Sequence, residues 1–124
     1  MELFRSRSRA YSTLLLWMAV IFFFSSMSGS ISGTIVSYDN LLVRKSAHVF
    51  EYLVLSFLSY NAFRLTYPRE RRGFVILLSV VLSLLYAFSD ETHQLFVPGR
   101  EGKLTDVGID LIGIAIGMIA VGTL

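Results

Sequence analysis

Four long apolar runs make up most of this chain of 124 residues and limit what it can fold into. The hydrocarbon core of a bilayer is about 30 Å thick, and a helix of about 20 residues crosses it. Over the whole chain 54% of the residues are hydrophobic and 16% are charged, a balance that the surface of a soluble domain does not tolerate. We therefore expect a polytopic membrane protein in which each run forms one transmembrane helix.

The predicted fold class is all-α, a bundle of four transmembrane helices in a lipid bilayer. The runs place these helices at about residues 10–27, 44–63, 73–96 and 105–124. A chain of this length is too short for two such bundles, so we expect a single membrane domain over residues 1–124. The chain contains no cysteine, which excludes disulfides and thiolate metal sites within it.

The arginines predict how these helices are oriented. Three arginines lie between residues 5 and 9, before the first run, and four lie between residues 64 and 72, in the second connection. Basic residues collect on the cytoplasmic side of membrane proteins, so we expect both segments, and with them both termini, in the cytoplasm. Because orientation accounts for these arginines, the net charge of +2 gives no reason to expect a nucleic-acid partner.

Ionisable residues interrupt the apolar pattern in two ordered strings, RKSAHVFEY at residues 44–52 and SDETHQLFVPGR at residues 89–100. A charged side chain near the centre of a membrane costs about 2.5–3.5 kcal/mol, so such residues normally face the interior of a bundle and serve a function. With the orientation above, both strings lie at the extracytoplasmic ends of their helices. The two strings therefore locate the candidate site.

Helical spacing brings these residues onto shared faces, because side chains three or four residues apart lie one above the other. The expected faces are Arg44, His48, Glu51 and Leu55 on the second helix, Asp90, His93 and Gln94 on the third, and Asp106 and Asp110 on the fourth. Gly113 and Gly117 continue the last face and let a neighbouring helix approach closely. We expect the three faces to meet in one polar pocket, and Trp17 with residues 22–24 to face lipid.

Three stretches combine rare intramembrane charges and small polar residues in a fixed order. They are IFFFSSMSG at residues 21–29, RKSAHVFEY, and YAFSDETHQLFVPGREGKLTDVGIDLIG at residues 86–113. Together they resemble the VanZ-like family of small bacterial membrane proteins, named for a teicoplanin-resistance protein. The family pattern carries over onto Lys45, His48, Glu51, Tyr52, Asp90, Glu91, Gln94, Phe96, Pro98, Gly99, Arg100, Asp106 and Gly113.

The resemblance covers about residues 20–117, and Asp110 departs from it, since the family usually has asparagine there. The departure adds a potential negative charge at this position. What the resemblance implies is a multi-pass protein of the bacterial cytoplasmic membrane, with a potential link to glycopeptide (teicoplanin) susceptibility.

Two sets of residues are the candidates for chemistry. The first set, which would move protons, comprises His48, Glu51, Asp90 and Glu91. The second set, which would hold a ligand, comprises Arg44, Lys45, Tyr52, Gln94, Arg100, Asp106 and Asp110. Its basic members suit an anionic group, such as the head group of a lipid-linked cell-wall precursor. A divalent metal cation is a further candidate ligand for Asp90, Glu91, His93, Asp106 and Asp110, although they match no recognised metal spacing.

Two classes of function stay open, and with them the question of whether the protein is an enzyme. In the first, the pocket binds or modifies an envelope component. In the second, the protein is a non-catalytic membrane interaction protein, and pairs such as His48 with a carboxylate form a structural core. We favour the first class, because apolar packing would have avoided the cost of inserting charges. A channel or transporter is disfavoured, since residues 53–58 and 114–121 contain almost no polar groups to line a pathway.

The orientation predicts opposite labelling of two connections. In intact cells, an impermeant thiol reagent should label a Glu101→Cys variant and leave an Arg71→Cys variant unlabelled, because position 101 faces out and position 71 faces the cytoplasm. The natural chain has no cysteine and is the background control. Labelling after permeabilisation checks that both cysteines react. Labelling of position 71 but not of position 101 in intact cells would reverse the orientation.

Overall fold

The computed structural model describes residues 5–26, 41–96 and 104–123. These residues form four α-helices and no strand: α1 at Arg7–Ser25, α3 at Leu41–Thr66, α4 at Arg72–Gln94 and α5 at Leu104–Gly122. The predicted all-α fold class is confirmed, and each helix end lies within one turn of its predicted place.

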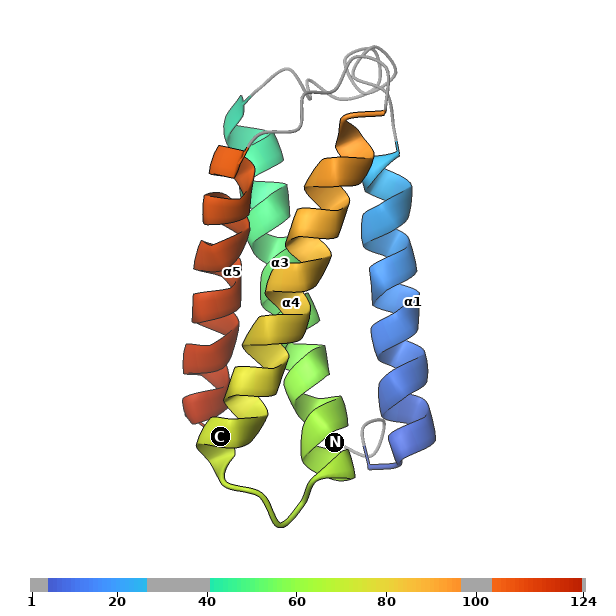
Figure 1. Ribbon diagram of the computed structural model, residues 1–124, viewed down its shortest axis with the longest axis vertical. Helices are drawn as coiled ribbons and strands as arrows, with labels where there is room; N and C mark the ends of the chain where they lie inside the picture. Colours follow the sequence, from blue (N-terminus) through green and yellow to red (C-terminus); the bar gives the residue numbers. More distant parts are fainter. Residues whose placement is uncertain (1–4, 27–40, 97–103, 124) are drawn as a thin grey trace.

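The helices run alternately up and down in a bundle (Figure 1). α1 and α4 begin at the lower end of the view, where α3 and α5 end, and the short turn at residues 67–71 joins α3 to α4 there. α3 packs against each of the other three helices, and its most extensive contact is with α5. It is therefore the central helix, and its side chains largely decide what the interior of the bundle contains.

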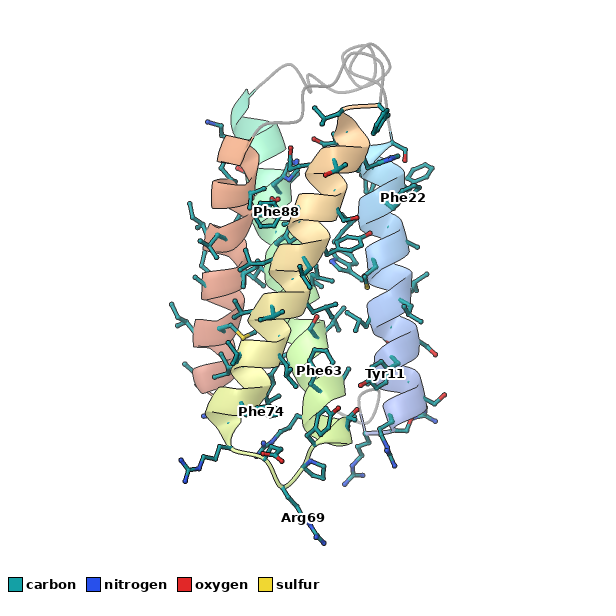
Figure 2. The ribbon with its side chains drawn as sticks, viewed as in Figure 1. Tyr11, Phe22, Phe63, Arg69, Phe74 and Phe88 are labelled. Atoms are coloured by element: carbon teal, nitrogen blue, oxygen red, sulfur yellow. The ribbon has the colours of Figure 1, made fainter. Side chains whose placement is uncertain are left out.

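The outer surface of the bundle is strongly apolar (Figure 2). Large hydrophobic side chains that are at least 59% exposed occur on every helix, among them Leu16 and Phe23 on α1, Phe50 on α3, Leu85 on α4 and Ile119 on α5. In water such a continuous surface would cause association, whereas lipid solvates it. The surface is that of a membrane protein.

Two of the helices, α1 and α4, are long and apolar enough to cross a membrane. Within α5, Val107–Gly122 is a shorter apolar helix. α3 is the least apolar of the four because Arg44, Lys45, Glu51 and Arg64 lie within it. Its central place fits this composition in part, because the neighbouring helices fully bury Tyr52, Ser56 and Ser59 and half-bury Glu51.

The contact between α3 and α5 depends on two glycines. A Cβ atom added at Gly113 would collide with the backbone carbonyl oxygen of Val49. One added at Gly117 would lie 2.8 Å from the carbonyl oxygen of Leu53 and would collide with Oγ of Ser56. The predicted close approach at these glycines is thus confirmed, with α3 as the partner helix.

Buried serines fill much of the remaining interior. Ser59, Ser79 and Ser83 have no exposed surface, and each hydroxyl donates to a carbonyl oxygen one turn earlier in its own helix at 2.7–2.8 Å. These hydrogen bonds satisfy the hydroxyls locally, so the small side chains let the helices pack closely at little polar cost.

The expectation that Trp17 faces lipid is wrong. Its indole is half-buried, and its Nε1 donates to the backbone carbonyl oxygen of Glu51 at 2.9 Å. The indole N–H needs an acceptor in an apolar environment, and the central helix supplies one. Phe22, Phe23 and Phe24 are exposed, as expected for lipid-facing residues.

Substitution of two glycines in α5 should have opposite effects on stability. Gly113→Ala should lower the free energy of unfolding by about 1–3 kcal/mol, because the added methyl group meets the backbone of α3. Gly108→Ala is the matched control, since a Cβ there meets no described atom within 4 Å, and it should raise stability by up to about 1 kcal/mol through helix propensity. Denaturant titration in detergent, followed by circular dichroism, measures both. Equal effects would contradict the close approach of α5 to α3.

Candidate functional site

The buried face of α4 changes from small residues to acids near the upper end of the bundle. Ser79, Ser83 and Ala87 are fully buried at every fourth position, and this stripe continues into Asp90, Glu91 and Gln94, which are 5%, 6% and 1% exposed. The small residues bring α4 close to its neighbours, so the side chains that follow in the stripe point inward. Helix packing therefore buries the carboxyl groups of both Asp90 and Glu91.

A short hydrogen bond joins α3 to α5 at the same level. Nδ1 of His48 lies 2.8 Å from Oδ1 of Asp110, and the Asp110 side chain has no exposed surface. An ionised carboxylate only accepts hydrogen bonds, so Nδ1 of His48 donates to Asp110. Nε2 is the other ring nitrogen, which can hold a proton or contact a ligand. Asp110 lies one turn before Gly113, and the close approach of α5 at that glycine brings its carboxylate to His48.

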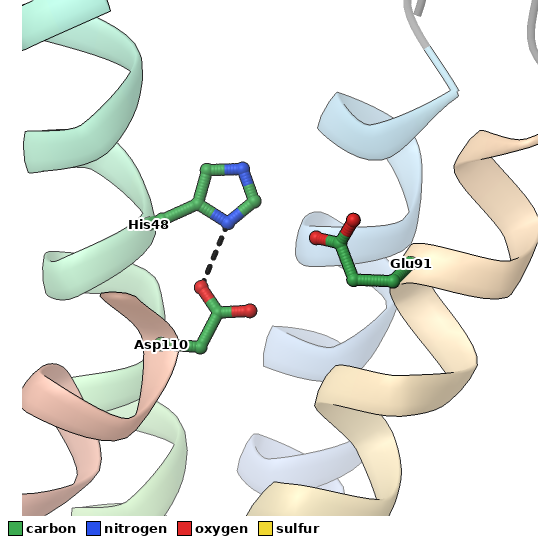
Figure 3. A group of neighbouring side chains, drawn as sticks. All are labelled: His48, Glu91 and Asp110. Carbon is green, nitrogen blue, oxygen red and sulfur yellow. Dashed lines mark hydrogen bonds and ion pairs between the residues drawn. The ribbon is translucent and has the colours of Figure 1, made fainter. Parts of the chain in front are cut away.

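Glu91 brings a third helix to this pair (Figure 3). Its carboxylate points from α4 toward His48 and Asp110. Each of the three residues offers one ligand atom, and these atoms all lie within 4.8 Å of one another. Nitrogen and carboxylate oxygen in this arrangement can hold a proton between them or bind a cation.

Tyr52, Asp90 and Gln94 extend the group. His48 interacts electrostatically with Glu51 and Asp90 as well as with Asp110, and the Tyr52 phenol interacts with the same carboxylates. Gln94 lies one turn beyond Asp90 on the buried face of α4. The members of this group, hereafter the polar cluster, are His48, Tyr52, Asp90, Glu91, Gln94 and Asp110.

The polar cluster contains buried side-chain atoms that have no hydrogen-bond partner among the described residues. Among them are the hydroxyl oxygen of Tyr52, in a side chain with no exposed surface, and Oε1 of Gln94. A buried polar atom without a partner costs about 1–3 kcal/mol, and folded proteins seldom keep one without a reason. The polar cluster thus carries hydrogen-bonding capacity that its own side chains do not use.

Glu51 lies at the edge of this group rather than at its centre. It is half-buried and lines a pocket of about 220 Å³ between α1 and α3, together with Trp17, Val20, Phe24, Ala47 and Phe50. The other described lining residues are apolar, so Glu51 is the one ionisable residue among those that the structure describes around this pocket. The position one residue later, Tyr52, is the one that points into the bundle.

The basic candidates for ligand binding are not in the polar cluster as described. Lys45 is exposed and lines a different, mainly apolar pocket of about 410 Å³ between α3 and α5. The side chains of Arg44 and Asp106, and the whole of Arg100, lie outside the described part of the chain. Their contribution to the site stays a prediction.

His93 is not beside the other candidate metal ligands. Its ring stacks on Phe22 with centroids 4.4 Å apart, and its Nε2 lies 3.0 Å from Oγ of Ser26. It belongs to the contact between α4 and α1, whereas His48 is the histidine that meets Glu91 and Asp110. Helical spacing within α4 could not reveal this, because the meeting of His48 with α4 and α5 is a tertiary contact.

Sequence reasoning did not single out Ser25 or Tyr86. Ser25 is 4% exposed, and its hydroxyl has no hydrogen-bond partner among the described residues. Tyr86 donates from its hydroxyl to the carbonyl oxygen of Met18, and its ring centroid lies 6.5 Å from that of Tyr52. Both belong to the stretches that carry the family resemblance, IFFFSSMSG and YAFSDETHQ, which was the signal that could have found them.

Comparison with known proteins agrees with the resemblance seen in the sequence. A family model described as VanZ/LLP1 matches residues 10–124, which include nearly all of the described helices. No curated protein and no solved structure matches the chain.

The bond between His48 and Asp110 predicts different outcomes for two substitutions. Asp110→Asn keeps an oxygen that can accept from Nδ1 of His48, so it should cost less than about 1 kcal/mol of unfolding free energy. Asp110→Ala leaves the buried imidazole without this acceptor and should cost about 1–3 kcal/mol. Denaturant titration in detergent compares the two. Equal losses would mean that the carboxylate charge, rather than the hydrogen bond, stabilises the contact of α5 with α3.

Proposed function

Because the chain belongs to the VanZ/LLP1 family, we propose that it is a multi-pass protein of the bacterial cytoplasmic membrane whose polar cluster binds or modifies an envelope component. In this proposal all four helices span the membrane, both termini are cytoplasmic, and the chain forms one membrane domain. The polar cluster then lies at the extracytoplasmic end, within reach of the outer leaflet.

The distribution of basic residues supports this orientation. The described arginines at the start of α1 and around the turn between α3 and α4 lie at the lower end of the bundle, where Figure 2 labels Arg69. The polar cluster lies toward the opposite end, on the last turns of α4 and the first turns of α3 and α5. The positive-inside rule assigns the lower end to the cytoplasm and hence the polar cluster to the outer side.

One observation carries the proposed binding role: the polar cluster contains buried hydrogen-bonding atoms that no described side chain uses. The phenol of Tyr52 interacts electrostatically with the carboxylates of Asp90 and Asp110, and Gln94 lies one turn beyond Asp90 on the buried face of α4. A purely structural core would gain by pairing these atoms or by replacing them with apolar groups. A ligand rich in hydroxyl, amide or phosphate groups would pair with them.

The head group of a lipid-linked cell-wall precursor has this chemistry. Beside the polar cluster, the pocket between α1 and α3 combines an apolar wall with the carboxyl group of Glu51. An amphiphilic ligand suits such a wall, because its chain contacts apolar side chains while its head group reaches the polar residues. In this role His48, Glu51, Asp90 and Glu91 transfer protons, and Arg44, Lys45 and Arg100 attract the anionic group.

A second candidate function has its own supporting observation. The bond between His48 and Asp110 ties α3 to α5, so the polar cluster could serve only to hold the helices in a membrane interaction protein. The two functions differ in what removal of a charge does. A binding site loses its function and keeps its fold, whereas a structural core loses its fold.

Two isosteric substitutions distinguish these functions. Asp90→Asn and Glu91→Gln should leave the amount and the unfolding temperature of the protein nearly unchanged. A deletion strain that carries either variant should nevertheless be as susceptible to teicoplanin as the deletion strain itself. Glu70→Gln is the matched control, since Glu70 is an exposed carboxylate in the turn at the other end of the bundle. Complementation of a deletion strain measures susceptibility, and mass spectrometry of co-purifying lipids tests the ligand directly. Unfolded variants would favour the structural core.

A further inference from the structure

We propose that the polar cluster binds a divalent transition-metal ion, with Zn²⁺ as the best fit, through His48, Glu91 and Asp110. This proposal rests on the proposed function only in treating the polar cluster as a binding site. It names an inorganic partner for that site, which the envelope component would then contact.

The geometry of the three residues supports a shared ion. Their ligand atoms lie within 4.8 Å of one another, and they come from α3, α4 and α5. Zinc holds nitrogen and oxygen ligands at about 2.0–2.2 Å, so two ligands of one tetrahedral ion are roughly 3.4 Å apart. His48 and Asp110 are already at 2.8 Å, and rotation of the longer Glu91 side chain can close the remaining distance (Figure 3).

The charge of the three residues matches a divalent ion. Two carboxylates and a neutral imidazole around M²⁺ form a group without net charge, which an apolar bundle buries at far lower cost than separate charges. An ion bound at Nδ1 would replace the Nδ1 proton of a His48 imidazolium; that proton is released to solvent, and the ring stays neutral with its other proton on Nε2.

The unused atoms of Tyr52 and Gln94 are an independent sign of a ligand at this place. Both side chains are at least nine-tenths buried, and the Tyr52 hydroxyl lies in the electrostatic field of Asp90 and Asp110. Zinc sites with three protein ligands keep a fourth position for water or substrate. The Tyr52 hydroxyl, which interacts with the Asp110 carboxylate, would bind and orient a group at that position, and the buried amide oxygen of Gln94 offers a further acceptor on α4.

The types of ligand favour zinc over magnesium. An imidazole nitrogen suits Zn²⁺ and other first-row transition metals, whereas Mg²⁺ prefers oxygen ligands in octahedral geometry and releases its water reluctantly. Two carboxylates with one histidine are also an ordinary mixture of nitrogen and oxygen ligands for zinc. A fourth position on the ion would accept a phosphate oxygen, such as that of a lipid-linked head group.

Metal titration of the purified wild-type protein tests the proposal. The protein in detergent, stripped with chelator and dialysed, should take up about one equivalent of Zn²⁺ by elemental analysis. Its unfolding temperature should rise with added ZnCl₂ and not with equal MgCl₂, because the ion joins three helices. If the protein takes up no zinc and its unfolding temperature does not change when ZnCl₂ is added, the proposal is overturned.

Two variants show whether the uptake occurs at these residues. Loss of an outer-shell partner alone costs about 10–100-fold in metal affinity, so Glu91→Gln, which removes a ligand, should weaken zinc binding at least about tenfold. Glu70→Gln should bind zinc like the wild type. Equal affinity in both variants would place the zinc elsewhere and overturn the proposal. If Glu91→Gln does not fold, two measurements on the wild type replace it. Isothermal titration with a chelator-buffered zinc series measures the affinity, and the zinc X-ray absorption spectrum identifies the ligand atoms. One nitrogen with oxygen ligands would support this site, and oxygen ligands alone would indicate a surface site and overturn the proposal.

The same preparations separate this proposal from the proposed function. An envelope lipid that co-purifies equally with metal-free and zinc-loaded protein would leave the proposed function intact and show that the ion is not required for it. Zinc uptake that Glu91→Gln abolishes, without any co-purifying lipid or change in susceptibility, would support the metal site and remove the envelope ligand.

Discussion

The close contact of α3 with α5 is the constraint on which the rest of the structure depends. At Gly113 and Gly117 the absence of a side chain lets the two helix backbones approach until a methyl group would no longer fit. This contact fixes the height and rotation of α5 on the central helix. As a consequence, Asp110, one turn before Gly113, meets His48 at hydrogen-bond distance, while the rest of α5 keeps its apolar face outward.

The polar cluster gains its properties from the apolar material around it. Within a low-dielectric bundle, hydrogen bonds and ion pairs are stronger than in water, and an unpaired polar atom is more costly. Ser59, Ser79 and Ser83 bond to their own helices, whereas the unused buried atoms of Tyr52, Gln94 and Ser25 lie toward the upper end of the bundle. Nδ2 of Asn61, near the end of α3, is a further buried atom without a partner among the described residues. Such a concentration of unused hydrogen-bonding capacity is typical of sites that bind something.

The sequence predicted a large part of this arrangement. Hydropathy located the four helices to within one turn, and the glycine spacing foretold a close helix contact. Spacing also placed His48, Asp90, Gln94 and Asp110 on inward faces. Spacing alone did not separate neighbouring positions: Glu51 was expected on the face of His48 and is half-buried beside Trp17, whereas the next residue, Tyr52, is fully buried. A periodicity of 3.6 residues resolves a face only to about one position, so the choice between adjacent residues falls to packing.

Local features of the sequence suffice to identify an α-helical membrane protein of the VanZ/LLP1 family with ionisable residues toward the ends of its helices. These properties follow from the length of the apolar runs and from the free-energy cost of placing a charge in lipid. Both can be judged for each segment of the sequence separately. In contrast, the packing of the whole bundle brings His48, rather than His93, to Glu91 and Asp110, and it buries the hydroxyl of Tyr52. Three helices must be set at definite heights and rotations for those atoms to meet, and that setting comes from side-chain packing between segments far apart in the chain.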